Sequence, residues 1–405
     1  MEKRPFEGIN VLDFTWAGVG PMAVNYLANY GATVVKIENF SRPDMTRTNP
    51  PYKDGIPGLN RSIYFAWINP AKKLDITLNL NHPRGVEVAR RLTRWADIVV
   101  ENFTPGTLEK WGFGYDDLKR IKEDVIMLRS CGYGQTGPIS EQPSLGFHLT
   151  SISGMNSFTG WPDRPPTELP GAFTDPIVAL FAATCLVAAL AYRRRTGKGQ
   201  CMDLSQVEAS VHFLAPLILD YSANKRNPER AGNRAPFAAP HGVYRCQGDD
   251  RWCAITVTTD EEWKSLCTVA RKPELTDSPM FSTFLKRKEN EDELDRLIEG
   301  WTQERTAEEA MHSLQAAGVA AGVVSNAQDL DEDPQLNHYE FNRELDHPEM
   351  GKCRFYHGPA FTLSEAAYEL SPPPLLGEST EYVCTQLLGM PDEEFVQLMQ
   401  EGAFD

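Results

Sequence analysis

Short apolar runs alternate with helical patterns along the first 135 residues of the chain. One helix is predicted from a glycine-rich turn at 17–21 to about Tyr30, and another, with an apolar stripe, from Pro83 to Trp95. Strands separated by helices indicate a parallel sheet with helices on both faces, which is a Rossmann-like α/β fold. The predicted strands are Asn10–Thr15, Thr33–Glu38, Asp97–Asn102 and Val125–Arg129.

The pattern changes after a polar stretch at 222–240, which is rich in Asn, Pro, Arg and Gly and predicts a linker. Two apolar runs, Gly242–Cys246 and Trp252–Val257, flank a turn and predict a β-hairpin, and charged helical segments follow them. The sequence therefore predicts a large Rossmann-like domain at 1–221, a small α+β domain at 222–325, and a return stretch at 326–405 that completes the large domain.

Composition and charge narrow the class of protein. The net charge of −16 argues against nucleic-acid binding. No apolar segment follows Met1–Pro5, so no signal peptide is predicted. The apolar run at 177–192 is shorter than the ~20 residues of a membrane span, so a buried core helix is expected instead. Eight cysteines without a C-x-x-C pair indicate reduced thiols, no metal site and a cytoplasmic protein.

Asp175 stands immediately before that apolar run. Thr174, Asp175 and Pro176 predict a helix start, with Asp175 at the cap and Pro176 at the first helical position. Free backbone N–H groups and the helix dipole are expected to hold the carboxylate ionised. A carboxylate fixed in this way is a candidate covalent nucleophile. An ordinary N-cap is the alternative, and it is the commoner reason for this local pattern.

Glycine-rich turns follow the predicted strands. Gly18, Gly20 and Ala23 match the dinucleotide pattern G-x-G-x-x-G/A, and Glu38 stands where the ribose acid of that pattern belongs. An NAD-dependent dehydrogenase is therefore one alternative, and a tight turn without a nucleotide is another. Asn102 and Phe103 follow a further strand, at the edge where parallel sheets bind ligands.

Eight segments in one order resemble the class III CoA-transferases, the formyl-CoA and carnitine CoA-transferase family. Together they cover nearly the whole chain. The matched pieces are Gly8–Thr15, Gly31–Glu38, Asp44–Arg47, Val100–Phe103 with Pro105–Gly106, Gly132–Pro138, Asp175, Thr196–Gln200 and Pro373–Glu378.

The resemblance implies a Rossmann-like large domain, a small middle domain and an interlocked dimer, formed by two copies or with a related subunit. Asp175 falls on the family's catalytic aspartate. It would attack an acyl-CoA thioester, form a mixed anhydride, and then carry CoA as an aspartyl thioester to an acceptor acid. CoA is then a substrate, and no permanently bound cofactor is expected.

The same resemblance assigns contacts with CoA. Lys110 stands where the family has an arginine, which keeps the charge and loses the bidentate fork. Two basic positions of the family read Asn39 and Asn81, so the phosphates are expected at Lys72, Lys73 or Arg47. The catalytic-loop glutamine of the formyl-CoA enzyme reads Gly18 here. The expected CoA-contacting residues are Ala17, Leu78, Asn102, Phe103, Lys110 and Gln206, with Lys73.

Racemases of 2-methylacyl-CoA thioesters share this fold and are the second alternative. They pair the aspartate with a histidine whose position reads Leu145, and His148 lies three residues later. Because a two-base proton exchange needs both groups, the transferase is favoured. The expected donor is an acyl-CoA such as succinyl-CoA, and the acceptor a bulky or aromatic acid such as a substituted succinate. The aromatic residues expected at the acyl end are Trp16, Phe147, Phe158 and Trp161.

Overall fold

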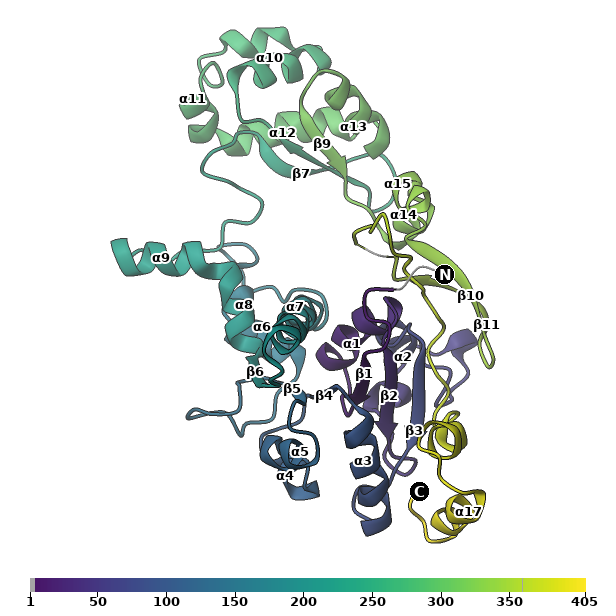
Figure 1. The fold of residues 1–405 in the computed structure, drawn as a ribbon. Coiled ribbons are helices and arrows are strands. Elements are labelled where there is room, and N and C mark those ends of the chain that lie inside the picture. Colours follow the sequence, from purple (N-terminus) through teal and green to yellow (C-terminus); the bar gives the residue numbers. More distant parts are fainter. Residues whose placement is uncertain (1–3, 359) are drawn as a thin grey trace. The chain divides into compact units, whose positions relative to one another are not determined.

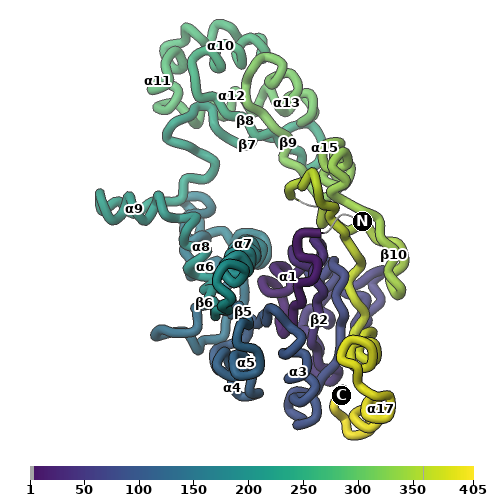
Figure 2. The backbone as a smooth tube through the Cα atoms, viewed as in Figure 1, coloured from purple at the N-terminus to yellow at the C-terminus, as the bar shows by residue number. Residues whose placement is uncertain are grey.

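The computed structural model describes residues 4–358 and 360–405, and the chain divides into two compact units. Figures 1 and 2 follow the chain from the N-terminal part of unit 1 through unit 2 and back into unit 1. Unit 2 begins within the predicted linker but ends later than residue 325, and it also takes in 158–167. Unit 1 holds residues 4–157, 168–227 and 335–405, and unit 2 holds 158–167 and 228–334.

Unit 1 is built on a six-stranded parallel sheet with the order β3-β2-β1-β4-β5-β6, and this order is the Rossmann arrangement. The Rossmann-like fold predicted from the sequence is therefore confirmed. The sequence pattern missed β3 and β6, because β3 buries Lys73 and Asp75 and β6 exposes alternate residues. The strands are β1 Asn10–Asp13, β2 Thr33–Glu38, β3 Lys73–Thr77, β4 Ile98–Glu101, β5 Ile126–Cys131 and β6 Cys201–Ser205.

Helices cover both faces of this sheet. On one face α1 (Val19–Asn29) and α7 (Thr174–Thr196) share a core with apolar residues of β1, β4 and β5. On the other face α3 (Pro83–Trp95) and α5 (Tyr115–Ile121) pack against the sheet. The other helices of this part are α2 Ile63–Ile68, α4 Thr107–Trp111, α6 Gly146–Ile152, α8 Gln206–Val211 and α9 Ala215–Asn224, with a 3₁₀ turn at Met45–Thr48.

Helix α7 differs from its prediction at the N-terminus. Phe173 is the N-cap and makes no side-chain capping bond, so Asp175 is the second helical residue and caps nothing. The helix runs for 23 residues, and by length and composition it could cross a membrane, which for one helix is weak evidence. Ala182 and Leu186 lie fully buried in the core of unit 1, whereas Leu180 and Val187 are 51% and 48% exposed. The helix expected to be buried is therefore buried on one face only.

The last part of the chain returns to unit 1. Helix α17 (Asp392–Gln400) lies beside α3 (Figures 1 and 2), and Phe395 and Leu398 are buried in the same core as α3. The other elements of this stretch are the antiparallel hairpin of β10 Asn342–His347 and β11 Gly351–Tyr356, helices α15 Pro334–His338 and α16 Thr380–Tyr382, and a π-helical turn at Val383–Leu387.

Unit 2 is a small α+β unit with the antiparallel sheet β7-β8-β9. The predicted hairpin is confirmed as β7 and β8. Capping boxes begin three of its helices, with Thr259, Thr306 and Asn326 as the N-caps, and Trp263 is buried in the core. The elements are β7 His241–Arg245, β8 Trp252–Thr256, β9 Ala320–Val323, α10 Asp260–Val269, α11 Phe284–Glu289, α12 Glu291–Thr302, α13 Ala307–Ala316 and α14 Ala327–Glu332.

Candidate active site

A pocket of about 280 Å³ lies at the carboxyl ends of the parallel strands of unit 1. Open parallel sheets bind ligands at this edge, at the point where the strand order reverses, here between β1 and β4. Its walls come from the segments that follow β1, β4, β5 and β6, together with the start of α7. The lining includes Trp16–Val19, Met45, Asn102–Pro105, Cys131, Gly132, Ser140, Gln142, Ser144–Gly146, Leu149, Asp175 and Gln206.

Asp175 is the carboxylate in this pocket lining. Burial raises the pKa of its carboxyl group from 3.8 to about 7, because an ionised carboxylate loses hydration in the pocket. The expectation that backbone N–H groups hold this carboxylate fully ionised is therefore wrong. The start of α7 does not compensate, since burial alone causes this shift and no hydrogen bond from the described residues lowers it. A desolvated carboxylate is a better nucleophile than a hydrated one.

Two glycines enclose the Asp175 carboxylate. A Cβ atom added at Gly18 would lie 2.2 Å from Oδ2, and one added at Gly146 would lie 2.7 Å from Oδ1 and 2.2 Å from the Cβ atom of Ala172. No side chain fits at either position without moving the carboxylate. The lack of a side chain at position 18 thus leaves room for the Asp175 carboxylate.

The start of α1 adjoins the same carboxylate. Gly18 is the N-cap of α1, and the helix carries no side-chain cap there. The first N–H groups of a helix have no partner within it and favour negative charge. Because Gly18 touches the carboxylate, these donors lie beside the atom that would attack a substrate. The arrangement can stabilise an oxyanion that forms next to Asp175.

Asn102 and Phe103 hold the turn between β1 and α1 from the side. The Asn102 Oδ1 atom accepts from the Trp16 N–H at 3.0 Å, and its Nδ2 atom donates to the Trp16 carbonyl at 2.6 Å. The Phe103 ring meets the Trp16 ring edge-on, with centroids 5.4 Å apart. The amide expected to bind CoA is therefore largely used within the protein, although Asn102 still lines the pocket.

Comparison with known proteins identifies the chemistry of this fold. A family model described as CoA-transferase family III matches residues 6–380. The chain belongs to this family. It is 31% identical over 398 residues to succinyl-CoA–D-citramalate CoA-transferase of Chloroflexus aurantiacus, covering 98% of this chain and 97% of that protein. It is 29% identical to human succinyl-CoA:glutarate CoA-transferase, covering 99% of this chain and 90% of that protein.

The fold is shared with a solved member of the same group. The crystal structure of a CAIB/BAIF family protein from Brucella suis matches with a TM-score of 0.87 and 29% identity, over 95% of this chain and all of that one. The family resemblance stated from the eight sequence segments is therefore confirmed, and the protein is a CoA-transferase.

The CoA-transferase brings some of its expected CoA-contacting residues together and leaves others apart. Leu78 is 1% exposed in the core and is absent from the pocket lining. Lys110 is exposed on α4, outside that lining. The Oε1 atom of Gln206 is buried and has no partner among the described residues, so it is available to a ligand. The expected residues that line the pocket are Ala17, Gly18, Asn102, Phe103, Asp175 and Gln206.

The structure does not place Lys73 or Arg47 at the pocket. The Nζ atom of Lys73 donates to the Pro21 carbonyl at 3.1 Å and lies 3.8 Å from an oxygen of Asp13. Burial lowers the pKa of Lys73 to about 8. Arg47 is fully buried and pairs with Glu38 at 2.8 Å. Both cations balance internal carboxylates, and neither is free to meet a CoA phosphate. Lys72 is exposed but lies outside the pocket lining.

Internal packing accounts for the dinucleotide-like turn of this CoA-transferase. A Cβ atom at Gly20 would lie 2.3 Å from Cγ2 of Thr15, and one at Gly18 would meet Asp175. Glu38, the expected ribose acid, is buried against Arg47. Both glycines and the acid are thus used by the fold itself, and the dehydrogenase alternative loses its evidence.

The second base of a racemase is also missing from the pocket lining. His148 is exposed, its ring lies against the Phe147 ring at 4.0 Å, and neither residue lines the pocket. Of the four aromatic residues expected at the acyl end, Trp16 lines the pocket, whereas Phe158 and Trp161 belong to unit 2.

Sequence reasoning missed several residues of the site. Tyr64 on α2 is one of them. Burial raises the pKa of the Tyr64 hydroxyl, and the negative charge of the nearby Asp175 carboxylate raises it further. Cys131 and Ser144 line the pocket, and Gly146 touches Asp175. The position of Cys131, at the end of a predicted strand, could have indicated it. Tyr64, Ser144 and Gly146 come from segments without a motif, and only the fold brings them to Asp175.

Proposed function

We propose that Asp175 transfers CoA from an acyl-CoA donor to a carboxylic acid through covalent intermediates. The observation that carries this proposal is the desolvated carboxylate between Gly18 and Gly146, at the uncapped start of α1. The position is suited to nucleophilic attack on a carbonyl, because the attacking oxygen and the N–H donors for the developing oxyanion lie together.

Each step exchanges one acyl bond for another. The Asp175 carboxylate attacks the donor thioester, the carbon–sulfur bond breaks, and a mixed anhydride and CoA thiolate result. The thiolate attacks the aspartyl carbonyl and releases the donor acid, which leaves CoA on Asp175 as a thioester. The acceptor carboxylate attacks that thioester, and the released thiolate then takes the acceptor acyl group. The sum needs no water, oxidant or proton.

Dicarboxylic acids are the proposed acceptor class, with succinyl-CoA as the donor. Relatives are named for transfer from succinyl-CoA to D-citramalate, glutarate and L-malate. Trp16 and Leu149 give the pocket apolar walls, and Ser140, Gln142 and Ser144 offer neutral donors to a second carboxylate. An aliphatic or aryl substituent on the acid would contact Trp16. This supports a substituted succinate.

A dimer is the proposed working form. Helix α9 contains no buried residue although it is rich in apolar side chains. Phe213 just before it and Leu219 and Tyr221 within it are 55%, 67% and 52% exposed. Such a surface is typical of an interface that a second chain covers. The partner is a second copy or a related subunit, since relatives include alpha and beta subunits of one transferase.

Covalent labelling tests the mechanism. Incubation with succinyl-CoA should leave a CoA thioester on the peptide that contains Asp175, detected by mass spectrometry and released by hydroxylamine. The variants Asp175→Ala and Asp175→Asn should form no adduct and transfer no CoA to a panel of acids. Asp392→Asn is the matched control, because Asp392 lies in the first turn of α17 but is exposed. Wild-type transfer by Asp175→Ala would refute the mechanism.

A further inference from the structure

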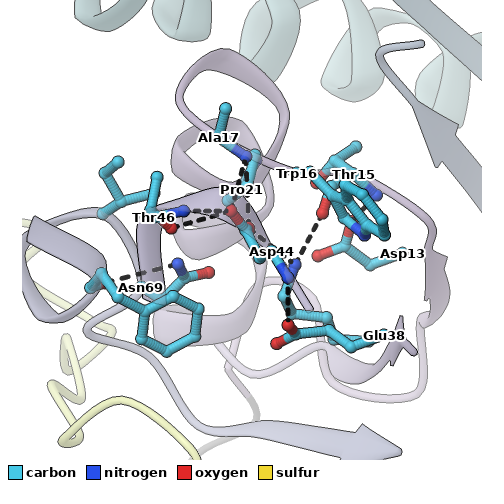
Figure 3. A network of polar contacts seen from close by, with 12 residues as sticks. Asp13, Thr15, Trp16, Ala17, Pro21, Glu38, Asp44, Thr46 and Asn69 are labelled. Atoms are coloured by element: carbon cyan, nitrogen blue, oxygen red, sulfur yellow. Dashed lines mark hydrogen bonds and ion pairs between the residues drawn. The ribbon is translucent and has the colours of Figure 1, made fainter. Parts of the chain in front are cut away.

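Seven charged side chains are buried beside the turn between β1 and α1, and Figure 3 shows Asp13, Glu38 and Asp44 among them. Burying ionised groups opposes folding unless each one is paired, and replacing such a cluster with apolar residues is often neutral or stabilising. Stability alone therefore does not explain why these charged residues are buried here. The members, each at most 3% exposed, are Asp13, Lys36, Glu38, Asp44, Arg47, Lys73 and Asp75.

The cluster holds the backbone of the turn at successive residues. Thr15 donates its N–H to Asp13 at 2.8 Å, and its carbonyl accepts from Lys36 Nζ at 2.6 Å. The Ala17 N–H lies 3.2 Å from each carboxylate oxygen of Asp44. Asn102 bonds the N–H and the carbonyl of Trp16. Each residue from 15 to 17 is therefore held by a side chain from another part of the chain.

Asp44 is itself fixed from several directions. Its Oδ1 atom accepts from the N–H and the hydroxyl of Thr46 at 3.0 and 2.8 Å, and Oδ2 lies 3.6 Å from Lys36 Nζ. Its own N–H donates to Glu38 at 2.9 Å. Asp44 is fully buried and absent from the pocket lining. An effect of Asp44 on the reaction therefore acts through backbone that it holds, either the turn at Ala17 or its neighbour Met45, which lines the pocket.

The contact with Ala17 bears on a strained residue. Ala17 has a φ of +59°, and the left-handed region costs a residue with a Cβ atom about 1–2 kcal/mol. Gly18, the next residue, touches the Asp175 carboxylate. A bond that keeps Ala17 in this conformation therefore also keeps the first N–H groups of α1 at the reacting carbonyl.

We propose that Asp44 is a positioning residue of the transfer reaction, which holds the Ala17 N–H and so keeps the start of α1 against Asp175. The inference rests on the proposed function of Asp175. A misplacement of about 1 Å can slow a reaction by roughly 100-fold, so a weaker hold on Ala17 should reduce the rate of thioester formation more than the affinity for CoA.

The variant Asp44→Asn keeps the size of the side chain and replaces one acceptor oxygen with a donor. Thr46→Val is the milder variant, since it removes one bond to Asp44. The matched control is Asp75→Asn. Asp75 belongs to the same buried cluster but accepts from Gly377 N–H at 2.7 Å and Arg47 at 3.2 Å. Asp75 also shares a hydrogen bond with Glu38, but none of its side-chain bonds reaches residues 15–17 directly.

The rate of thioester formation is the first test of this proposal. In single-turnover assays with succinyl-CoA, Asp44→Asn should form the Asp175 thioester at least about tenfold more slowly, with its Kd for CoA within about twofold of wild type. Thr46→Val should show a smaller loss of rate. Asp75→Asn should keep the wild-type rate within about threefold, even where urea unfolding shows an equal or larger loss of stability.

Amide hydrogen exchange of the peptide spanning Thr15–Gly20 tests the turn without any activity. It should be faster in Asp44→Asn and unchanged in Asp75→Asn. Unchanged exchange in Asp44→Asn, or an equal loss of rate in both aspartate variants, would overturn the proposal. If the wild-type protein forms no thioester, the proposed function fails, and the exchange experiment still decides whether Asp44 holds the turn.

Discussion

The close packing around Asp175 also sets the reactivity of its carboxylate. The carboxylate that would attack the donor is buried and contacts Gly18 and Gly146. Burial makes the anion less stable and more reactive, and the uncapped start of α1 adjoins it at Gly18.

The rate of thioester formation should depend on pH around neutrality. Asp175 attacks as the anion, and burial raises its pKa to about 7. The rate constant of the first half-reaction, measured under single-turnover conditions with limiting succinyl-CoA, should rise between pH 5.5 and 8.5 with a midpoint of about 7. A midpoint near 4, the value of an ordinary aspartate, would show that the carboxylate is solvated in the working enzyme.

Asp175→Asn should be more stable than wild type at alkaline pH. The folded-state pKa lies above the unfolded value, so the contribution of Asp175 to stability is fully present below about pH 4 and is lost as the pH rises through 7. The shift from 3.8 to about 7 corresponds to at most about 4 kcal/mol. Urea unfolding should give equal stabilities at pH 4 and a gap favouring Asp175→Asn at pH 8. A constant gap would contradict this origin.

Gly18→Ala should impair the reaction through space alone. The added methyl group would stand 2.2 Å from Oδ2 of Asp175, so the carboxylate must move, and we expect a loss of roughly 100-fold in kcat. Gly300→Ala is the control, because nothing lies within 4 Å of its added atom. That variant should keep full activity and gain up to about 1 kcal/mol of stability. Equal kcat in both variants would refute the packing argument.

Among the elements, α7 and α9 are both apolar and differ in what covers them. Leu186 of α7 is fully buried in the core of unit 1, whereas α9 buries no residue. The same type of sequence thus has one face in the core in α7 and no buried face in α9. Proteins rarely leave such a helix exposed to water, and the proposed dimer interface would cover α9.

Leu219→Glu should weaken the dimer. Leu219 is 67% exposed on α9, and a charge there would be buried by a second chain. Sedimentation velocity should show a shift from dimer to monomer, together with a loss of activity where the partner completes the site. Leu285→Glu is the control, since Leu285 on α11 of unit 2 is 69% exposed. Identical sedimentation of Leu219→Glu and wild type would remove α9 from the interface.

For the whole molecule, the strand order of a dinucleotide-binding sheet serves a CoA-transferase. The order β3-β2-β1-β4-β5-β6 places the pocket at the switch between β1 and β4, as in nucleotide-binding enzymes. The fold alone therefore does not separate NAD from CoA. What separates them is the use of Gly18, Gly20 and Glu38 for internal contacts.

CoA should stabilise the whole protein and NAD should not. A ligand that binds the native state raises its stability by RT ln(1 + [L]/Kd), about 2.7 kcal/mol at a hundred times Kd. Thermal unfolding followed by circular dichroism should therefore shift upward with CoA in millimolar excess and stay unchanged with NAD or NADH. A shift with NAD alone would restore the dehydrogenase alternative.

The sequence by itself determined the elements whose periodicity is unambiguous. The bounds of β2 and α3 agree with their predictions, because Thr33–Glu38 is a continuous buried run and Pro83–Trp95 carries a clear apolar stripe. The eight ordered segments also determined the family, and with it Asp175 as the candidate nucleophile. These features are local or depend on order along the chain, so no packing is needed to find them.

The tertiary structure alone decided the electrostatics of the site. The local pattern around Asp175 predicts a low pKa, but α1 and α6 remove water from the carboxylate and raise its pKa to about 7. Lys73 and Arg47 look like phosphate ligands in the sequence, and the fold uses them to neutralise buried carboxylates. Desolvation and charge pairing depend on residues far apart in the chain, and therefore only folding decides them.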